Sequence, residues 1–291
     1  MRLFGFRNKS VAARKTIQAI GEDSASSAFD LADVLEEMSF LDHLEELRWR
    51  ILKGIGAVIL GAVFCGIFDD FVIDQILLGP TKQDFFMYQL FGFEAKALIL
   101  QNRTVTGQFF AYWGSVFVVG IIIGAPIAIY QFWKFIEPGL YPEEKKGMRF
   151  ASFFATGFFV LGVGFGYCVI TPMALQFFAN FVISEQIVNE FDITKYFSLI
   201  TMWVFGVGLL FELPVVMFFL SKIGIVDSTV LRKGRKYALI AILILGAILT
   251  PPDPVSQLLV AVPMVGLYEL SIWIAKHVER REKRRLEKAL E

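Results

Sequence analysis

Long apolar runs separated by short charged segments dominate this chain. Six of them predict membrane-spanning helices, because about 20 apolar residues of helix cross a hydrocarbon core of about 30 Å. The runs are Ile51–Phe68, Phe109–Ile136, Phe150–Phe178, Tyr196–Leu220, Tyr237–Leu249 and Leu258–Ala275. The fifth has only 13 residues, so we interpret it and the sixth as a short hairpin joined by a polar turn. The pattern predicts an all-α, polytopic membrane protein with six transmembrane helices.

The composition supports a membrane protein. Hydrophobic residues make up 56% of the 291 residues and charged residues only 19%, whereas a soluble domain carries about 25% charged residues. The formal net charge is zero, with 28 Lys and Arg against 28 Asp and Glu. A balanced charge disfavours a nucleic-acid binder, which needs a basic surface.

The placement of the basic residues predicts the orientation. If the N-terminus lies inside, the inner segments carry 22 Lys and Arg residues and the outer segments carry 4. This excess satisfies the positive-inside rule with both termini cytoplasmic. We therefore expect a cytoplasmic N-terminal extension at 1–38, a six-span membrane domain at 39–276 and a charged cytoplasmic tail at 277–291. The first 38 residues contain no apolar core typical of a cleavable secretory signal.

Glu212 is the most informative polar residue, because it lies within the fourth apolar run. A carboxyl group at this depth costs several kcal/mol and indicates a functional site. Lys, Arg and His are absent from the deep parts of the runs, so Glu212 must be protonated, hydrated or bonded to polar groups of this or another subunit. Pro214 follows two residues later and loosens the helix there. By contrast, we interpret Glu269, nearer the inner end of the sixth run, as hydrated.

Glu212 also permits an alternative function, a proton-coupled secondary transporter in which this residue titrates. Such transporters often contain inverted repeats, and none is visible here. An enzyme is not expected, because the runs contain no Ser–His pair, no HExxH motif and no P-loop. The two histidines and two cysteines lack the spacing of a metal site. The sequence thus predicts no metal and no cofactor.

Acidic residues gather at the predicted inner face, which is otherwise basic. The segment FLDHLEELRWR precedes the first run, and FIEPGLYPEEKKGMR joins the second run to the third. They place Glu46 beside Arg48 and Glu144 after Phe135. Such anionic patches suit a cationic partner, although solvated helix faces commonly carry similar charges.

These segments resemble the TatC family, the multispanning subunits of the twin-arginine protein translocase. The resemblance is carried in order by FLDHLEELRWR, FWKFIEPGLYPEEKK, FGVGLLFELPV and TPPDPVSQ followed by AVPM, and it runs from about Met38 to Lys276. It implies a receptor in the cytoplasmic membrane of a bacterium that binds signal peptides with consecutive arginines. It also implies a multimeric complex, with TatA- and TatB-type single-span partners, that exports folded proteins using the proton motive force.

The resemblance also assigns roles to residues. Glu46 and Glu144 match the carboxylates implicated in reading the arginines, with Phe135 and Arg48 beside them. Other matching positions are the intramembrane acid Glu212, the first-outer-loop proline Pro80, and Asp253 and Gln257 of the polar turn. We expect the helices to form a concave surface near Glu212 and Gln257 on which partner helices dock. The outer loop 69–108 is longer than the resemblance implies, so the family pattern does not predict the shape of the outer side.

Overall fold

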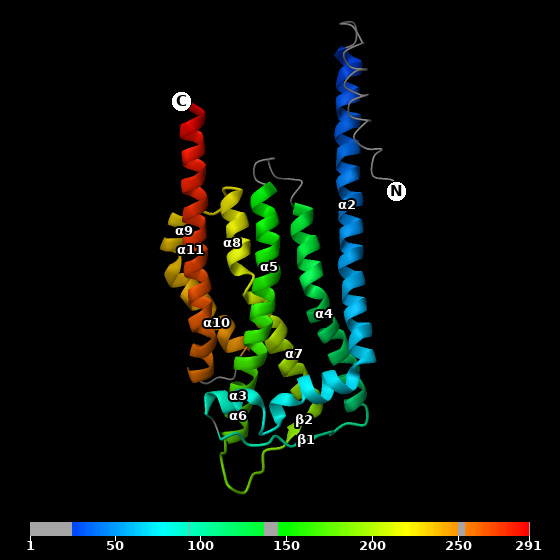
Figure 1. Cartoon of the computed structure of the whole chain (residues 1–291), viewed down its shortest axis with the longest axis vertical. Helices are drawn as coiled ribbons and strands as arrows, with labels where there is room; N and C mark the ends of the chain where they lie inside the picture. The colour runs from blue at the N-terminus through cyan, green and yellow to red at the C-terminus, as the bar shows by residue number, and fades with distance from the viewer. Residues whose placement is uncertain (1–24, 93, 137–144, 250–253, 291) are drawn as a thin grey trace. The chain divides into compact units, whose positions relative to one another are not determined.

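The computed structural model describes residues 25–92, 94–136, 145–249 and 254–290, and the backbone of these residues is almost entirely helical (Figure 1). The chain divides into two compact units, residues 1–50 and 51–291. Helix α2 (Ala25–Ile67) begins inside the predicted N-terminal extension and crosses the boundary between the units. Each unit is described by itself below.

The second unit contains the C-terminal part of α2 and a series of further elements. They are η1 (Phe71–Leu77), η2 (Gly79–Thr81), α3 (Phe86–Phe91), β1 (Leu100–Gln101), α4 (Gly107–Ile136), α5 (Lys145–Phe165), η4 (Gly166–Ile170), α6 (Thr171–Asn180), β2 (Phe191–Asp192), α7 (Ile193–Leu210), α8 (Leu213–Lys222), α9 (Ser228–Lys233), α10 (Arg235–Leu249) and α11 (Pro254–Leu290).

In the described residues, five segments are long and apolar enough to cross a membrane. They are 44–67, 107–136, 152–180, 193–222 and 257–280. These match five of the six predicted spans within a few residues, except that the first begins seven residues earlier, at Leu44. The remaining span is α10, whose 15 residues rise about 22 Å. The polytopic all-α fold is confirmed, while the sixth span and the N-in/C-in orientation stay predictions.

Prolines interrupt two of these segments. A π-helical stretch, η4, separates α5 from α6 just before Pro172, and the Thr171 hydroxyl donates to the Gly166 carbonyl at 2.9 Å. A second break separates α7 from α8 just before Pro214. Proline lacks the N–H that would continue the helix. Neighbouring side chains can satisfy the carbonyls that such breaks leave free.

Helix α7 forms the centre of the second unit, because it packs against both α4 and α5. Its residues Ile200, Trp203 and Val207 are all at most 2% exposed. Large apolar side chains on other helix faces stay exposed, as Leu60 of α2 does at 71%. An apolar helix face without protein cover suits a lipid environment.

The two short strands lie at one end of the second unit, where α3 and α6 also lie (Figure 1). Strands β1 and β2 pair in parallel, with Leu100 opposite Phe191. Asp192 then caps α7, because its Oδ1 accepts from the backbone N–H groups of Thr194 and Lys195 at 3.0 and 3.1 Å. We call residues 69–106 and 181–192 the β-strand end.

Candidate functional site

Glu212 lies at the break between α7 and α8, where it is the residue that precedes the first turn of α8. Its backbone stays near the helical region, with φ −73° and ψ −14°, and its N–H donates to the Leu209 carbonyl at 3.1 Å. The Glu212 carbonyl in turn accepts from Val215 and Val216. The backbone N–H and carbonyl of Glu212 therefore both keep hydrogen bonds at the break. The predicted coincidence of an acidic residue and a helix interruption is observed.

The Glu212 side chain is buried without a polar partner. The residue is 9% exposed, and neither carboxylate oxygen accepts or donates a hydrogen bond within the described part of the chain. Its chain neighbours Phe211, Pro214 and Val215 are buried and apolar. A buried carboxyl group without a partner costs about 1–3 kcal/mol, and more if it is charged. The sequence left three possibilities for Glu212: protonation, hydration, or a bond to polar groups of this or another subunit. A hydrogen bond to another described residue of this chain is now excluded.

Two serines share this property and were missed by the sequence interpretation. In the residues that the structure describes, the buried side-chain oxygens without a hydrogen-bond partner belong to Ser115, Glu212 and Ser221. All three lie in candidate spans. A serine in a helix commonly donates to a carbonyl one turn earlier, so its sequence position alone does not indicate a free hydroxyl.

Gln257 joins the last two helices. Its side-chain Nε2 donates to the Leu243 carbonyl of α10 at 3.0 Å, although Gln257 itself belongs to α11. The amide thus ties the two helices together close to their connection, as expected for a hairpin. Glu269, interpreted as hydrated, is half exposed and also accepts from Arg235 at 2.7 Å, so an ion pair joins α10 and α11. Both groups of this ion pair are about half exposed.

The residues predicted to read arginines are only partly described. Glu46 is half-buried and pairs with Arg50 one turn later on α2, whose Nε donates to Glu46 Oε1 at 3.1 Å. Arg48 is exposed, and Phe135 at the end of α4 is half-buried. Glu144 and Asp253 lie outside the described residues. Glu46 and Phe135 belong to different units, so their meeting at one site stays a prediction.

Pro80 lies in a segment that three tyrosines hold. It is buried at the start of η2, and its carbonyl accepts from the Tyr88 hydroxyl at 2.6 Å. Tyr196 of α7 donates to the Leu77 carbonyl at 2.6 Å, and Tyr167 of η4 donates to the Ile76 carbonyl at 2.7 Å. Burial raises the pKa of the Tyr88 phenol, while Gln176 nearby lowers it by a smaller amount. Burial thus disfavours the charged phenolate of Tyr88 and favours the neutral phenol that donates this hydrogen bond.

A further contact, between Gln176 and Lys96, holds the first loop, residues 69–106. Gln176 of α6 binds the backbone of Lys96 twice, because its Oε1 accepts from the Lys96 N–H and its Nε2 donates to the Lys96 carbonyl, both at 3.0 Å. Together with the tyrosines and the β1–β2 pair, this contact fixes the first loop against α6 and α7. The described residues of the loop therefore form a cap at the β-strand end.

Removing one tyrosine hydroxyl is expected to weaken this cap. Tyr196→Phe keeps the buried ring and leaves the Leu77 carbonyl without its donor, so we expect the free energy of unfolding to fall by about 1–2 kcal/mol. Chemical denaturation of the purified protein in detergent measures this change. Tyr237→Phe is the control, because Tyr237 is 78% exposed and its variant should unfold like the wild type. Equal stability of the two variants would show that the clamp contributes nothing.

The fold and the site define the class of protein: a polytopic helical membrane protein with an acidic group buried at a helix break. In the described ranges, no three His, Cys, Asp or Glu side chains are close enough to hold a metal ion. The chain belongs to the TatC family, because the family model for the Sec-independent protein translocase protein TatC matches residues 42–263. Members of this family are components of a protein translocase.

Individual relatives agree with this assignment. The TatC protein of Blattabacterium is 36% identical over 260 residues, which cover 84% of this chain and 98% of the relative. TatC of Helicobacter pylori strain 26695 is also 36% identical, over 81% of this chain and 87% of its own length. A crystal structure of the twin-arginine translocase receptor TatC superposes with a TM-score of 0.65 at 31% identity, covering 81% of this chain and 99% of that one.

Proposed function

We propose that this chain is the receptor subunit of a twin-arginine translocase. In this proposal, Glu46 and Glu144 bind the consecutive arginines of signal peptides at the cytoplasmic face, and Glu212 docks helices of TatA- and TatB-type single-span partners. The observation that carries the proposal is the buried, unpaired carboxyl group of Glu212 in a chain of the TatC family. A polar residue from another subunit could supply the missing hydrogen bond.

The chemistry of arginine supports the first part of the proposal. A guanidinium group offers a rigid fork of donors that a carboxylate can meet with two parallel bonds, whereas a lysine ammonium cannot. Glu46 already pairs with Arg50, whose Nε and Nη2 both donate to the one oxygen Oε1. A pair between residues four apart on a helix contributes only about 0.3–0.5 kcal/mol, so an incoming arginine can replace Arg50.

Ion pairs alone cannot supply the affinity. An exposed pair contributes about 0–1 kcal/mol, while burial of the apolar part of a signal peptide contributes about 25 cal/mol per Å². In the proposed receptor, the carboxylates therefore provide specificity and the membrane-facing helices provide most of the affinity. No catalytic step is part of this function.

The location and assembly follow from the same proposal. We place the protein in the bacterial cytoplasmic membrane with both termini inside, as the excess of basic residues in the inner segments favours. It would act in a multimeric complex surrounded by lipid. No observation favours the alternative of a proton-coupled transporter.

Peptide binding tests the recognition step. A fluorescent synthetic signal peptide with Arg-Arg, or with Lys-Lys, is titrated against the purified protein in lipid nanodiscs and followed by anisotropy. We expect Glu46→Gln and Glu144→Gln each to weaken Arg-Arg binding by up to about fivefold, and the double variant to bind both peptides alike. The exposed neighbour Glu45, changed to Gln, is the control and should keep the preference. Retention of the arginine preference by the double variant would refute the recognition role.

A further inference from the structure

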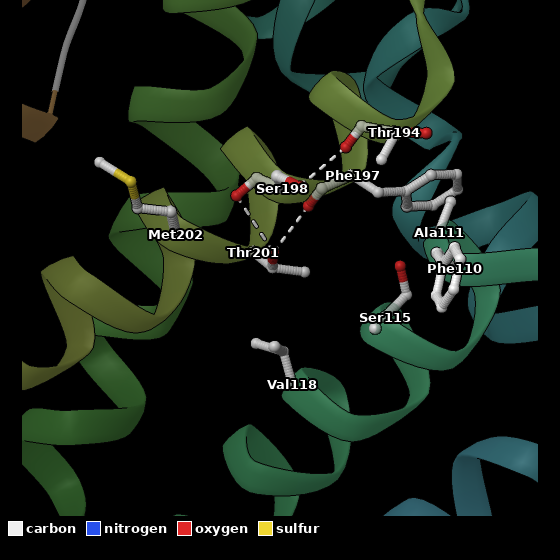
Figure 2. A pocket seen from close by; sticks show the side chains of 10 residues that line it. Phe110, Ala111, Ser115, Val118, Thr194, Phe197, Ser198, Thr201 and Met202 are labelled. Atoms are coloured by element: carbon white, nitrogen blue, oxygen red, sulfur yellow. Dashed lines mark hydrogen bonds between the residues drawn. The ribbon is translucent and has the colours of Figure 1, made fainter. Parts of the chain in front are cut away.

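A groove of about 290 Å³ lies between α4 and α7, within the second unit (Figure 2). Its floor is formed by Ala111 and Ser115 of α4 and by Phe197 and Thr201 of α7, each at most 7% exposed. The groove lies close to the β-strand end and within two candidate spans. Glu212 is the eleventh residue after Thr201, a rise of about 16 Å along a helix, so the groove is a different place from the acidic site.

The rim of the groove is open. Gly114 of α4 and Ser198 and Met202 of α7 line it and are exposed. Small residues on a membrane helix allow another helix to approach its backbone closely. Gly114 at the rim, with small residues on the floor below it, gives α4 such a surface.

Three hydroxyl groups of α7 in the groove already donate hydrogen bonds to backbone carbonyls. Ser198 Oγ donates to the Thr194 carbonyl at 2.8 Å, and Thr201 Oγ1 donates to the Phe197 carbonyl at 2.6 Å (Figure 2). Thr194 Oγ1 donates across to the Gly107 carbonyl of α4 at 3.5 Å. A hydroxyl has one proton and two lone pairs, so these three groups can still accept hydrogen bonds but can no longer donate.

Ser115 adds the group that indicates a ligand. It is 3% exposed, it lines the groove, and its Oγ has no partner among the described residues. A ligand in the groove would therefore face the three acceptor hydroxyls of α7 and one hydroxyl, that of Ser115, which can accept or donate. Lipid chains carry no polar group, and lipid esters only accept. The groove matches a hydrogen-bond donor, such as a side-chain amide, on an apolar segment.

We propose that the groove between α4 and α7 is a docking site for a transmembrane helix of another polypeptide that carries a side-chain amide near the level of Ser115. The amide donates to the hydroxyls of α7 and exchanges a hydrogen bond with Ser115. The small residues of α4 receive the helix backbone. This site does not depend on arginine recognition or on Glu212.

Synthetic helices test the proposal directly. One peptide is a Leu/Ala transmembrane helix with a Gln one third of the way from each end, and the other has Leu at both positions. Each is reconstituted with the full-length protein carrying a photo-crosslinking residue at Met202, at the rim. The matched control carries the crosslinker at Leu199, which is also exposed on α7 but does not line the groove. We expect adducts at position 202 to be about three- to tenfold more abundant with the Gln peptide, and no such preference at position 199.

Two variants of Ser115 distinguish the effect of its hydrogen bond from the effect of the volume of the groove. Ser115→Ala keeps the groove and should remove most of the preference for Gln, with the Leu peptide unaffected. Ser115→Leu fills the groove and should reduce adducts of both peptides at position 202. Equal adducts with the two peptides, adducts with lipid alone, or crosslinks between two copies of the protein that the Gln peptide does not displace would each overturn the proposal.

Discussion

Replacing Glu212 with Leu is expected to abolish export of a twin-arginine precursor and, at the same time, to raise the thermal stability of the protein. The two effects have opposite signs because the same feature causes both. The buried carboxyl group has no partner within the described residues, and leaving such a group unpaired costs about 1–3 kcal/mol. Leucine has a similar size and no polar atoms, so this cost disappears together with the group that a partner helix would bind.

Two measurements check this expectation. Export of a folded reporter with a twin-arginine signal is followed in cells that contain only the variant, and thermal unfolding of the purified variant is followed in detergent. Glu269→Leu is the matched control, because it also replaces a glutamate with leucine but does so in a half-exposed ion pair with Arg235. Such a pair contributes about 0–1 kcal/mol, so the control should change neither result strongly.

A third variant distinguishes hydrogen bonding from charge. Glu212→Gln keeps a polar group able to donate and accept, so it should retain part of the recruitment of partner subunits, which copurification measures. Normal export by Glu212→Leu, or a lower unfolding temperature for that variant, would mean that Glu212 is a structural residue.

The transmembrane part of the fold could be predicted because lipid restricts the choices. A segment in a bilayer must satisfy its own backbone, and a helix does so. The run predicted at 109–136 is therefore the helix 107–136, and the run predicted at 196–220 is the candidate span 193–222. The break at Glu212 was also visible, because Pro214 has a fixed chemical consequence wherever it occurs.

The β-strand end could not be predicted in the same way. Its shape depends on contacts between distant residues, such as Tyr196 with Leu77 and Tyr167 with Ile76. In the sequence, these tyrosines are merely members of apolar runs. Hydrophobic periodicity indicates which face of an element is buried. It does not indicate which backbone carbonyl accepts a hydrogen bond from a tyrosine hydroxyl.

The polar residues of the spans show the same division. Glu212 was identified because a carboxyl group in an apolar run is rare whatever its surroundings. Ser115 and Ser221 were not, since serine is tolerated in helices when it bonds to its own backbone. Ser198 and Ser271 do so, at 2.8 Å each. Only the structure distinguishes these satisfied serines from the unpaired ones.

Substitution of Gly124 by Leu is expected to separate α2 from α4 and to destabilise the membrane domain strongly. Gly120 and Gly124 are four residues apart on α4, at the spacing that lets two membrane helices approach closely. A Cβ atom at Gly124 would lie 2.6 Å from Val58 Cα, and one at Gly120 would lie 2.7 Å from Ala62 Cα. Both distances are shorter than the van der Waals contact of two carbon atoms. The contacted atoms belong to the backbone of α2, so no side-chain rotation can relieve the clash.

The expected loss for Gly124→Leu is about 3 kcal/mol or more, because overpacking by even a few carbon atoms costs about 1–3 kcal/mol. Thermal unfolding in detergent and the amount of protein retained in the membrane measure it. Gly56→Leu is the control on α2, since a Cβ there would meet no heavy atom within 4 Å, and this variant should remain as stable as the wild type. If the two leucine variants unfold at the same temperature, the contact between α2 and α4 does not stabilise the domain. The close approach of α2 to α4 at Gly120 and Gly124 then has no energetic role.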